Sequence, residues 1–174
     1  YPDYHDRIED ILTFCDGLEG YHPFFWIDPT EEDACDQVEY AAKSGIQGFK
    51  ILCSKYYPCD GIKTYEAIAK HHLPVLFHSG ALWDGQVSSD FNRPMQFEGL
   101  MHVEGFRFAL AHVSWPWCDE CIALYGKLLS AERGGDNHSR CDASMFIDTT
   151  PGTPFIYRKQ VFEKIFLINY QLKE

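Results

Sequence analysis

A chain of 174 residues, 45% hydrophobic and 16% aromatic, can bury a sizeable core and has the usual length of one domain. Its 26 acidic residues against 15 basic ones give a formal net charge of −11, and no run of Lys or Arg interrupts that excess. A polyanion such as DNA or RNA would be repelled by this charge. We therefore expect a single domain over residues 1–174 without a nucleic-acid partner.

Hydropathy and cysteine content indicate the compartment. The chain has no uninterrupted stretch of about 20 apolar residues, and its first residues lack a signal-peptide pattern, so we expect no membrane partner. Seven cysteines without the dense spacing of a disulfide scaffold favour reduced thiols and a cytoplasmic protein. Cys118 and Cys121 form a CxxC motif with no partner motif, for which packing is favoured over redox or metal chemistry.

Apolar runs of strand length alternate along the chain with helical spacings. The first helix is expected at 4–14, and Thr30 is a good N-cap for the next helix, which ends before Gly45. Further helices are expected at 63–71, 95–103, 117–131 and 155–168, and an exposed polar loop at 133–140. Strands are expected at 24–27, 48–52, 74–78, 107–112 and 144–148.

Strands that are almost continuously apolar and are separated by helices indicate a parallel sheet. Both a barrel and an open doubly wound sheet satisfy the pattern, and in either fold the chemistry collects beyond the carboxyl ends of the strands. Four residues with chemically active side chains lie at or near these ends: Lys50, His78, His112 and Asp148. We expect them to share one pocket mouth.

The two strand-end histidines have the placement of metal ligands. A catalytic zinc typically takes three protein ligands and a water whose pKa falls to about 7. A single histidine after a strand would more often serve packing, but His78 and His112 on neighbouring βα units favour a metal. Structural or solvated roles are expected for the remaining histidines, which are His5, His22, His71, His72, His102 and His138.

Five segments carry a resemblance to a known family: 27–29 (Ile-Asp-Pro), 48–51 (Gly-Phe-Lys-Ile), 74–80 (Pro-Val-Leu-Phe-His-Ser-Gly), 109–112 (Ala-Leu-Ala-His) and 146–149 (Phe-Ile-Asp-Thr). Their order and spacing resemble the third to seventh strands of the amidohydrolase superfamily, in its amidohydrolase-related (amidohydrolase 2) branch of metal-dependent hydrolases and decarboxylases. The resemblance implies an α/β fold of the (β/α)8 TIM-barrel type, incomplete in this chain, with about five βα units.

The resemblance also implies roles for three strand-end residues. His78 would be a metal ligand, and His112 a second ligand or a general acid/base beside the metal. Lys50 stands where some relatives have a carbamylated bridging lysine, and we interpret it as a substrate contact or a strand-end charge. The implied cofactor is a divalent metal, zinc in the first place and manganese as the alternative.

Substrate contacts are expected from residues that follow the strands. Trp83 and Arg93, in the loop after the third strand, would gate the site or bind a carboxylate. Trp115 would line an apolar wall, with packing as the favoured alternative. Asp148 and the loop 149–154 would bind substrate, although an aspartate after a strand is equally often a turn former.

The leading expected activity is hydrolysis of an amide, ester or lactone by metal-activated water. Decarboxylation of an aromatic or unsaturated acid is the alternative, and a metal-free binding remnant of the same fold is another. The family's His-x-His pair and its eighth-strand Asp are absent, and a barrel needs about 250 residues, so we expect this chain to be part of a longer protein. The expected partner is a small-molecule substrate, with a homodimer as an open alternative.

Overall fold

One sheet organises the computed structural model, which describes residues 3–133 and 140–167. Its strands are β1 (Phe24–Trp26), β2 (Gly48–Ile51), β3 (Pro74–Phe77), β4 (Arg107–Leu110) and β5 (Ser144–Ile147). All neighbouring strands pair in parallel, in the order β1-β2-β3-β4-β5. The predicted parallel α/β fold is thus confirmed, and each strand begins at its predicted residue but ends one or two residues earlier.

Helices precede, separate and follow the strands, as predicted. They are α1 (Tyr4–Cys15), α2 (Ala34–Ser44), α3 (Ile62–Lys70), α4 (Cys118–Arg133) and α5 (Phe155–Leu167). Short 3-10 segments are η1 (Pro58–Gly61), η2 (Ser89–Asn92), η3 (Pro94–His102) and η4 (Ala111–Ser114). The predicted loop at 133–140 lies almost wholly outside the described residues. Within the described ranges, no helix combines the length and apolarity needed to cross a membrane.

The start of α2 was predicted wrongly. The helix begins at Ala34 with Asp33 as its N-cap, rather than after Thr30. The reason is that Asp28 accepts hydrogen bonds from the backbone nitrogen and the hydroxyl of Thr30, at 2.9 and 2.7 Å, and so fixes a turn there. The end of the helix is as predicted, because Gly45 adopts the left-handed conformation with φ of 105°.

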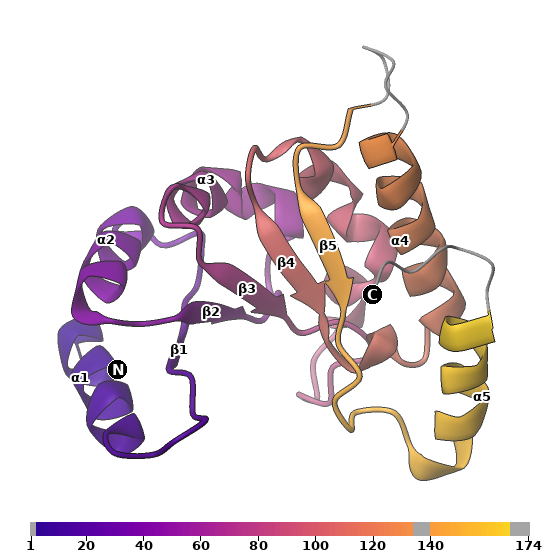
Figure 1. The fold of residues 1–174 in the computed structure, drawn as a ribbon, viewed down its shortest axis with the longest axis horizontal. Coiled ribbons are helices and arrows are strands. Elements are labelled where there is room, and N and C mark those ends of the chain that lie inside the picture. Colours follow the sequence, from indigo (N-terminus) through magenta and orange to yellow (C-terminus); the bar gives the residue numbers. More distant parts are fainter. Residues whose placement is uncertain (1–2, 134–139, 168–174) are drawn as a thin grey trace.

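One face of the sheet forms the main core. Successive strand residues point to opposite faces, and the buried set is Phe25, Phe49, Ile51, Val75, Phe77, Phe108, Leu110 and Met145. Helices α1 to α4 lie along the side of the sheet that these residues face (Figure 1). At roughly 25 cal/mol per Å² of apolar surface removed from water, this one-sided burial is the main stabilising contribution.

The other face of the sheet is covered by no helix in the described part of the chain (Figure 1). The register aligns one residue of each strand into a row across it: Trp26, Lys50, Leu76, Ala109 and Phe146. Trp26 is 43% exposed and Phe146 is 51% exposed. We call this surface the inner face. It is largely apolar, apart from the Lys50 side chain on β2 and, toward the amino ends of the strands, Arg107 and Ser144.

Aromatic rings fill the core between α3 and strands β3 and β4. Tyr65 stacks on Phe106 with ring centroids 5.2 Å apart and meets the edge of Phe77 at 5.5 Å. Its side chain is fully buried, and its hydroxyl has no hydrogen-bond partner among the described residues. A buried hydroxyl without a partner loses its bonds to water and gains none in return.

We expect Tyr65→Phe to raise the free energy of unfolding by about 1 kcal/mol, because it removes this unsatisfied hydroxyl without changing the packing of the ring. Tyr56→Phe is the matched control. The Tyr56 hydroxyl donates to the Leu52 carbonyl at 3.0 Å, so its loss should lower stability by about 1 kcal/mol. Urea denaturation of both variants measures the difference, and a destabilised Tyr65→Phe would contradict the prediction.

Candidate functional site

Four predicted site residues converge at the carboxyl edge of the sheet. Lys50 is the third residue of β2, His78 and Asp148 directly follow β3 and β5, and His112 lies two residues beyond β4. His78 and His112 have ring centroids 5.6 Å apart with an interplanar angle of 61°. Lys50 interacts electrostatically with both His78 and Asp148. The parallel sheet therefore brings all four residues into one cluster, which we call the strand-end cluster.

His78 has one ring nitrogen without a partner. Its Nε2 atom is buried and makes no hydrogen bond within the described residues, whereas the ring has a backbone hydrogen bond with Ala81. Burial, together with the nearby Lys50 and His112, lowers the pKa of His78 to about 4. At neutral pH the imidazole is uncharged, which is the form that binds a metal.

The pair of imidazoles fits two positions of a zinc site. Two imidazoles bound to one tetrahedral zinc by Zn–N bonds of about 2.0–2.1 Å have ring centroids roughly 5 Å apart. The centroids of His78 and His112 are 5.6 Å apart. A backbone bond on one ring nitrogen, with the other left bare, is also the usual arrangement around a metal-binding histidine. The described residues contain no group of three His, Cys, Asp or Glu side chains that could hold a metal.

The loop between β5 and α5 orients His112. The Thr150 hydroxyl lies 3.0 Å from Nδ1 of His112 and makes a short hydrogen bond to Oδ2 of Asp148. The same Oδ2 atom accepts the backbone N–H of His112 at 3.2 Å. A Cβ added at Gly152 would lie 2.2 Å from the His112 ring, so only glycine allows this close approach. Asp148 and Thr150 thus fix both the backbone and the ring of His112.

The backbone around His112 is strained. His112, Val113 and Ser114 have φ values of 61°, 50° and 56°, all in the left-handed region. A β-branched residue such as Val113 rarely adopts this conformation, and each such residue costs about 1–3 kcal/mol. The β5–α5 loop holds the turn in place: Val113 donates to the Asp148 carbonyl at 2.9 Å, and the Thr153 hydroxyl donates to the His112 carbonyl at 3.0 Å. Strain held by surrounding bonds is typical of a functional position.

Lys50 projects from the inner face rather than from a loop. Its side chain is half-buried, and burial lowers the pKa of the amine to about 8, while the nearby Asp148 carboxylate opposes the shift. At neutral pH the amine remains mostly protonated. It therefore supplies the strand-end cluster with a positive charge that can contact an anionic group of a substrate.

Hydrogen bonds join the loop after β3 to the loop after β4. The Ser79 hydroxyl donates to the Ser114 hydroxyl at 2.8 Å and lies 3.1 Å from the Asn92 carbonyl. Ala81 donates its N–H to the Trp115 carbonyl at 3.0 Å. Ser79 and Ala81 closely follow His78, and Ser114 and Trp115 closely follow His112. These bonds therefore fix the loops from which the imidazoles project.

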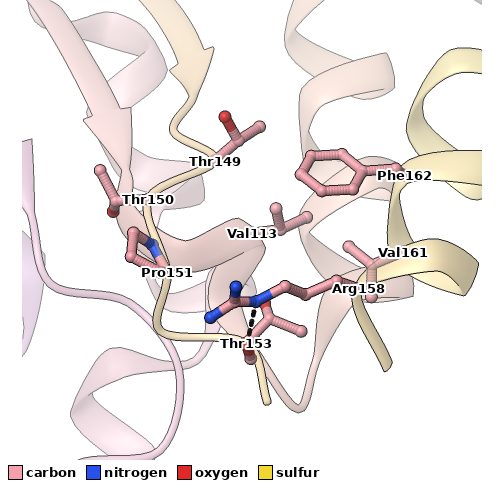
Figure 2. A pocket seen from close by; sticks show the side chains of 8 residues that line it. All are labelled: Val113, Thr149, Thr150, Pro151, Thr153, Arg158, Val161 and Phe162. Carbon is pink, nitrogen blue, oxygen red and sulfur yellow. Dashed lines mark hydrogen bonds between the residues drawn. The ribbon is translucent and has the colours of Figure 1, made fainter. Parts of the chain in front are cut away.

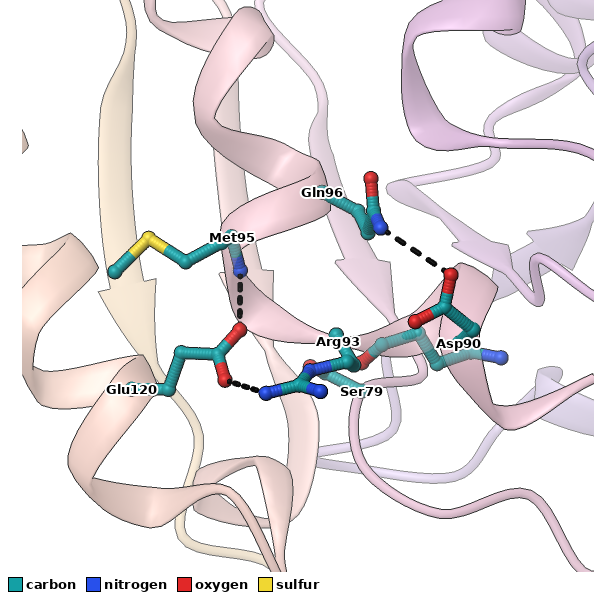
Figure 3. A network of polar contacts seen from close by, with 7 residues as sticks. Ser79, Asp90, Arg93, Met95, Gln96 and Glu120 are labelled. Atoms are coloured by element: carbon teal, nitrogen blue, oxygen red, sulfur yellow. Dashed lines mark hydrogen bonds and ion pairs between the residues drawn. The ribbon is translucent and has the colours of Figure 1, made fainter.

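Arg93 lies in a polar network between the loop after β3 and α4. Its guanidinium donates to Glu120 at 2.7 Å, and the same carboxylate accepts the backbone N–H of Met95 at 3.1 Å (Figure 3). The guanidinium also lies 5.2 Å from the centroid of the Trp117 ring. Arg93 thus ties the loop to α4 in this structure. Its expected role in substrate binding stays a prediction.

The two predicted tryptophan contacts differ in their surroundings. Trp83 is 85% exposed in the loop after β3. Trp115 is half-buried and stacks on Tyr157 of α5, with ring centroids 6.0 Å apart. This contact agrees with the packing role that the sequence favoured for Trp115. Substrate contact by either ring stays a prediction.

The CxxC motif lies in the first turn of α4. The side chains of Cys118 and Cys121 are 5% and 0% exposed, and both thiols are free. Burial raises the pKa of Cys121 to about 12, so this thiol stays protonated at neutral pH and is a poor nucleophile. These observations agree with the favoured packing role.

The sequence placed Thr150 only in the expected substrate loop 149–154, and it did not single out the buried pair Ser79 and Ser114. A signal for Thr150 was present, because an aspartate followed two residues later by threonine is typical of an Asx turn, and Asp148 does accept the Thr150 backbone N–H at 3.3 Å. For the two serines no local signal exists, since they lie 35 residues apart in the chain.

Comparisons with known proteins assign no family. Neither the scan against protein-family models nor the search of curated proteins gives a match to this chain. The functional interpretation therefore rests on the geometry of the strand-end cluster and on the sequence motifs.

Gly80→Ala should destabilise the protein by roughly 2–5 kcal/mol. The loss has two causes, which are the strain of a positive φ at a non-glycine residue and a steric overlap of the new Cβ with the backbone. Gly80 has φ of 109°, and an added Cβ would lie 2.2 Å from the Trp115 carbonyl oxygen. Gly85→Ala is the control, because Gly85 also has a positive φ, 72°, but nothing within 4 Å of its Cβ position. Urea denaturation should show a loss of about 1–2 kcal/mol for the control. Equal losses would contradict the loop contact.

The free energy of unfolding should fall as the pH drops from about 6.5 to about 4, because His78 has a folded-state pKa of about 4 against an ordinary histidine value of 6.5. In this window the unfolded chain binds a proton that the folded chain does not. His78→Gln should flatten the pH dependence, and His102→Gln, at an exposed histidine, should leave it unchanged. Thermal unfolding with a chelator present measures this, and parallel curves for all three proteins would contradict it.

Proposed function

We propose that this chain is part of a metal-dependent hydrolase of the amidohydrolase type, with a divalent metal at the carboxyl ends of β3 and β4. The observation that carries the proposal is the juxtaposition of His78 and His112, 5.6 Å apart, with the Nε2 atom of His78 buried and unpartnered. A bare buried nitrogen costs free energy unless a proton donor or a metal occupies it.

A TIM-barrel type of fold is part of the proposal, and two observations support it. The strands follow one another in sequence order with helices on one side, whereas a doubly wound sheet reverses its order and has helices on both. Phe24 of β1 and Phe146 of β5 also line one open hollow of about 310 Å³. In a flat sheet these strands would lie about 19 Å apart, so the inner face is concave.

In this proposal His78 holds the metal, which is zinc or, as the alternative, manganese. When bound, the metal supplies a water of lowered pKa that can attack an amide, ester or lactone carbonyl. The remaining ligands come from residues outside the described ranges, on further strands that would also cover the inner face. Such strands would account for the exposed apolar side chains of Trp26 and Phe146.

His112 serves as a second ligand or as the proton carrier. Its Nδ1 atom faces the Thr150 hydroxyl, and the Asp148 carboxylate holds that hydroxyl. This leaves Nε2 of His112 to bind the metal or to carry a proton between the attacking water and the leaving group. Asp148 and Thr150 act as positioning residues, because they set the ring orientation on which either role depends.

Decarboxylation of an aromatic acid is the second candidate, and the inner face gives it specific support. The Lys50 ammonium lies in the same row as Trp26, Leu76 and Phe146. A cation set among aromatic and aliphatic side chains suits an aromatic carboxylate. Product analysis with an aromatic acid distinguishes the two activities, since only decarboxylation releases CO2.

His78→Ala should weaken zinc binding to the purified protein by at least about tenfold, because it removes a nitrogen that is bare and neutral. His102→Ala is the matched control, since His102 is an exposed histidine at the end of η3. Calorimetric titration with zinc measures both affinities. His112→Ala separates its two roles, because a ligand loses zinc affinity and a proton carrier keeps it.

Two outcomes would contradict the proposed metal site. If the complete protein, with the further strands in place, takes up no zinc or manganese, the metal-free binding module is the better interpretation. If His78→Ala and His102→Ala bind zinc equally well, the strand-end cluster is not the metal site.

A further inference from the structure

A separate cavity of about 110 Å³ lies between η4, the β5–α5 loop and α5 (Figure 2). One wall is apolar and consists of Val113, Val161 and Phe162. The polar lining includes Thr149 and Arg158. The cavity is thus amphipathic, with a single positive charge opposite a hydrocarbon surface.

Arg158 is held in a fixed orientation. Its Nε atom donates to the Thr153 carbonyl at 2.9 Å, and its guanidinium lies 5.8 Å from the centroid of the Phe155 ring. Figure 2 shows the side chain extending from α5 toward the loop at Pro151 and Thr153. The backbone bond uses only Nε, which leaves the two terminal nitrogens of the guanidinium available to a ligand.

The charge of Arg158 is uncompensated in an acidic protein. Basic residues number 15 and acidic residues 26, yet Arg158 forms no ion pair within the described residues. Its exposed neighbour Lys159, in contrast, pairs with Glu163 at 3.8 Å. A half-buried, oriented arginine without an acidic partner is available to bind a carboxylate through its planar fork.

We propose that this cavity is a binding site for a short aliphatic carboxylate. The terminal guanidinium nitrogens of Arg158 would bind the carboxylate, and the alkyl group would lie against Val161 and Phe162. The size agrees, because an apolar cavity of about 150 Å³ accommodates benzene and this one is smaller. A fully hydrated anion such as phosphate would gain nothing from the apolar wall.

The site is distinct from the strand-end cluster. Thr150 separates the two, since its hydroxyl is already bound to Asp148 and lies 3.0 Å from the His112 ring. No metal is needed to bind a carboxylate in this cavity. The proposal therefore goes beyond the hydrolase and is tested on chelator-treated protein, where loss of metal chemistry has no effect on the result.

The test is a titration of the chain with isobutyrate, followed by the methyl signals of its valines in NMR spectra. Val113 and Val161 line the cavity, so their signals should shift in a saturable manner. Val38 belongs to α2 and is buried in the main core, so its signal should stay fixed. Isobutyramide has the same shape without the charge and should bind about ten- to a hundredfold more weakly.

Two variants test whether Arg158 supplies the positive charge that binds isobutyrate. Arg158→Gln should weaken isobutyrate binding by the same factor as loss of the ligand's charge, whereas Lys159→Gln removes a charge one residue away and should leave the affinity unchanged. An unchanged Val38 signal shows that each variant is folded. If Arg158→Gln does not fold, Arg158→Lys replaces it, and its affinity should lie below that of the wild type because lysine lacks the fork.

Three results would overturn the proposal. The first is no saturable shift of Val113 and Val161 with isobutyrate. The second is equal affinity for isobutyrate and isobutyramide, which would mean that Arg158 does not contribute. The third is equal affinity for isobutyrate and inorganic phosphate, which would make the cavity a general anion site in which the apolar wall has no role.

Discussion

Parallel pairing of each strand with its sequence neighbour is the constraint on which the other features depend. Each parallel connection must return the chain to the same end of the sheet, and right-handed crossovers place the intervening helices on the same side. Two consequences follow together. The carboxyl ends of β2 to β5 lie along one edge, which collects Lys50, His78, His112 and Asp148, and the other sheet face receives no helix in the described part of the chain.

The strand-end cluster combines strain with rigid support. Three consecutive left-handed residues at His112, Val113 and Ser114 are unfavourable by themselves. They are tolerated because the β5–α5 loop bonds to both the N–H and the carbonyl of His112, through Asp148 and Thr153. The strained turn lowers stability locally, but it holds the imidazoles of His78 and His112 in fixed positions. Among the described residues, the Nε2 atom of His78 has no hydrogen-bond partner. That combination is common in active sites and unusual in a core.

Local sequence patterns predicted the strands well, because apolar runs bounded by Gly and Pro mark a buried strand from its own residues alone. They could not decide the strand order, since a barrel and a doubly wound sheet give the same alternation. They also missed the start of α2, where the Asp28 carboxylate competes with the helix for Thr30. The pairing of Arg93 with Glu120, 27 residues apart, and the left-handed conformation of Val113 arise only from tertiary contacts.

The bare inner face also affects how the chain behaves in water at high concentration. Its exposed apolar side chains, together with the free edges of β1 and β5 in the described sheet, are surfaces through which copies can associate. The net charge of −11 opposes that association by mutual repulsion. Salt weakens the repulsion, since the Debye length is only about 10 Å at 0.1 M, while the attraction between apolar faces persists. We therefore expect copies of the chain to associate more readily as the ionic strength rises.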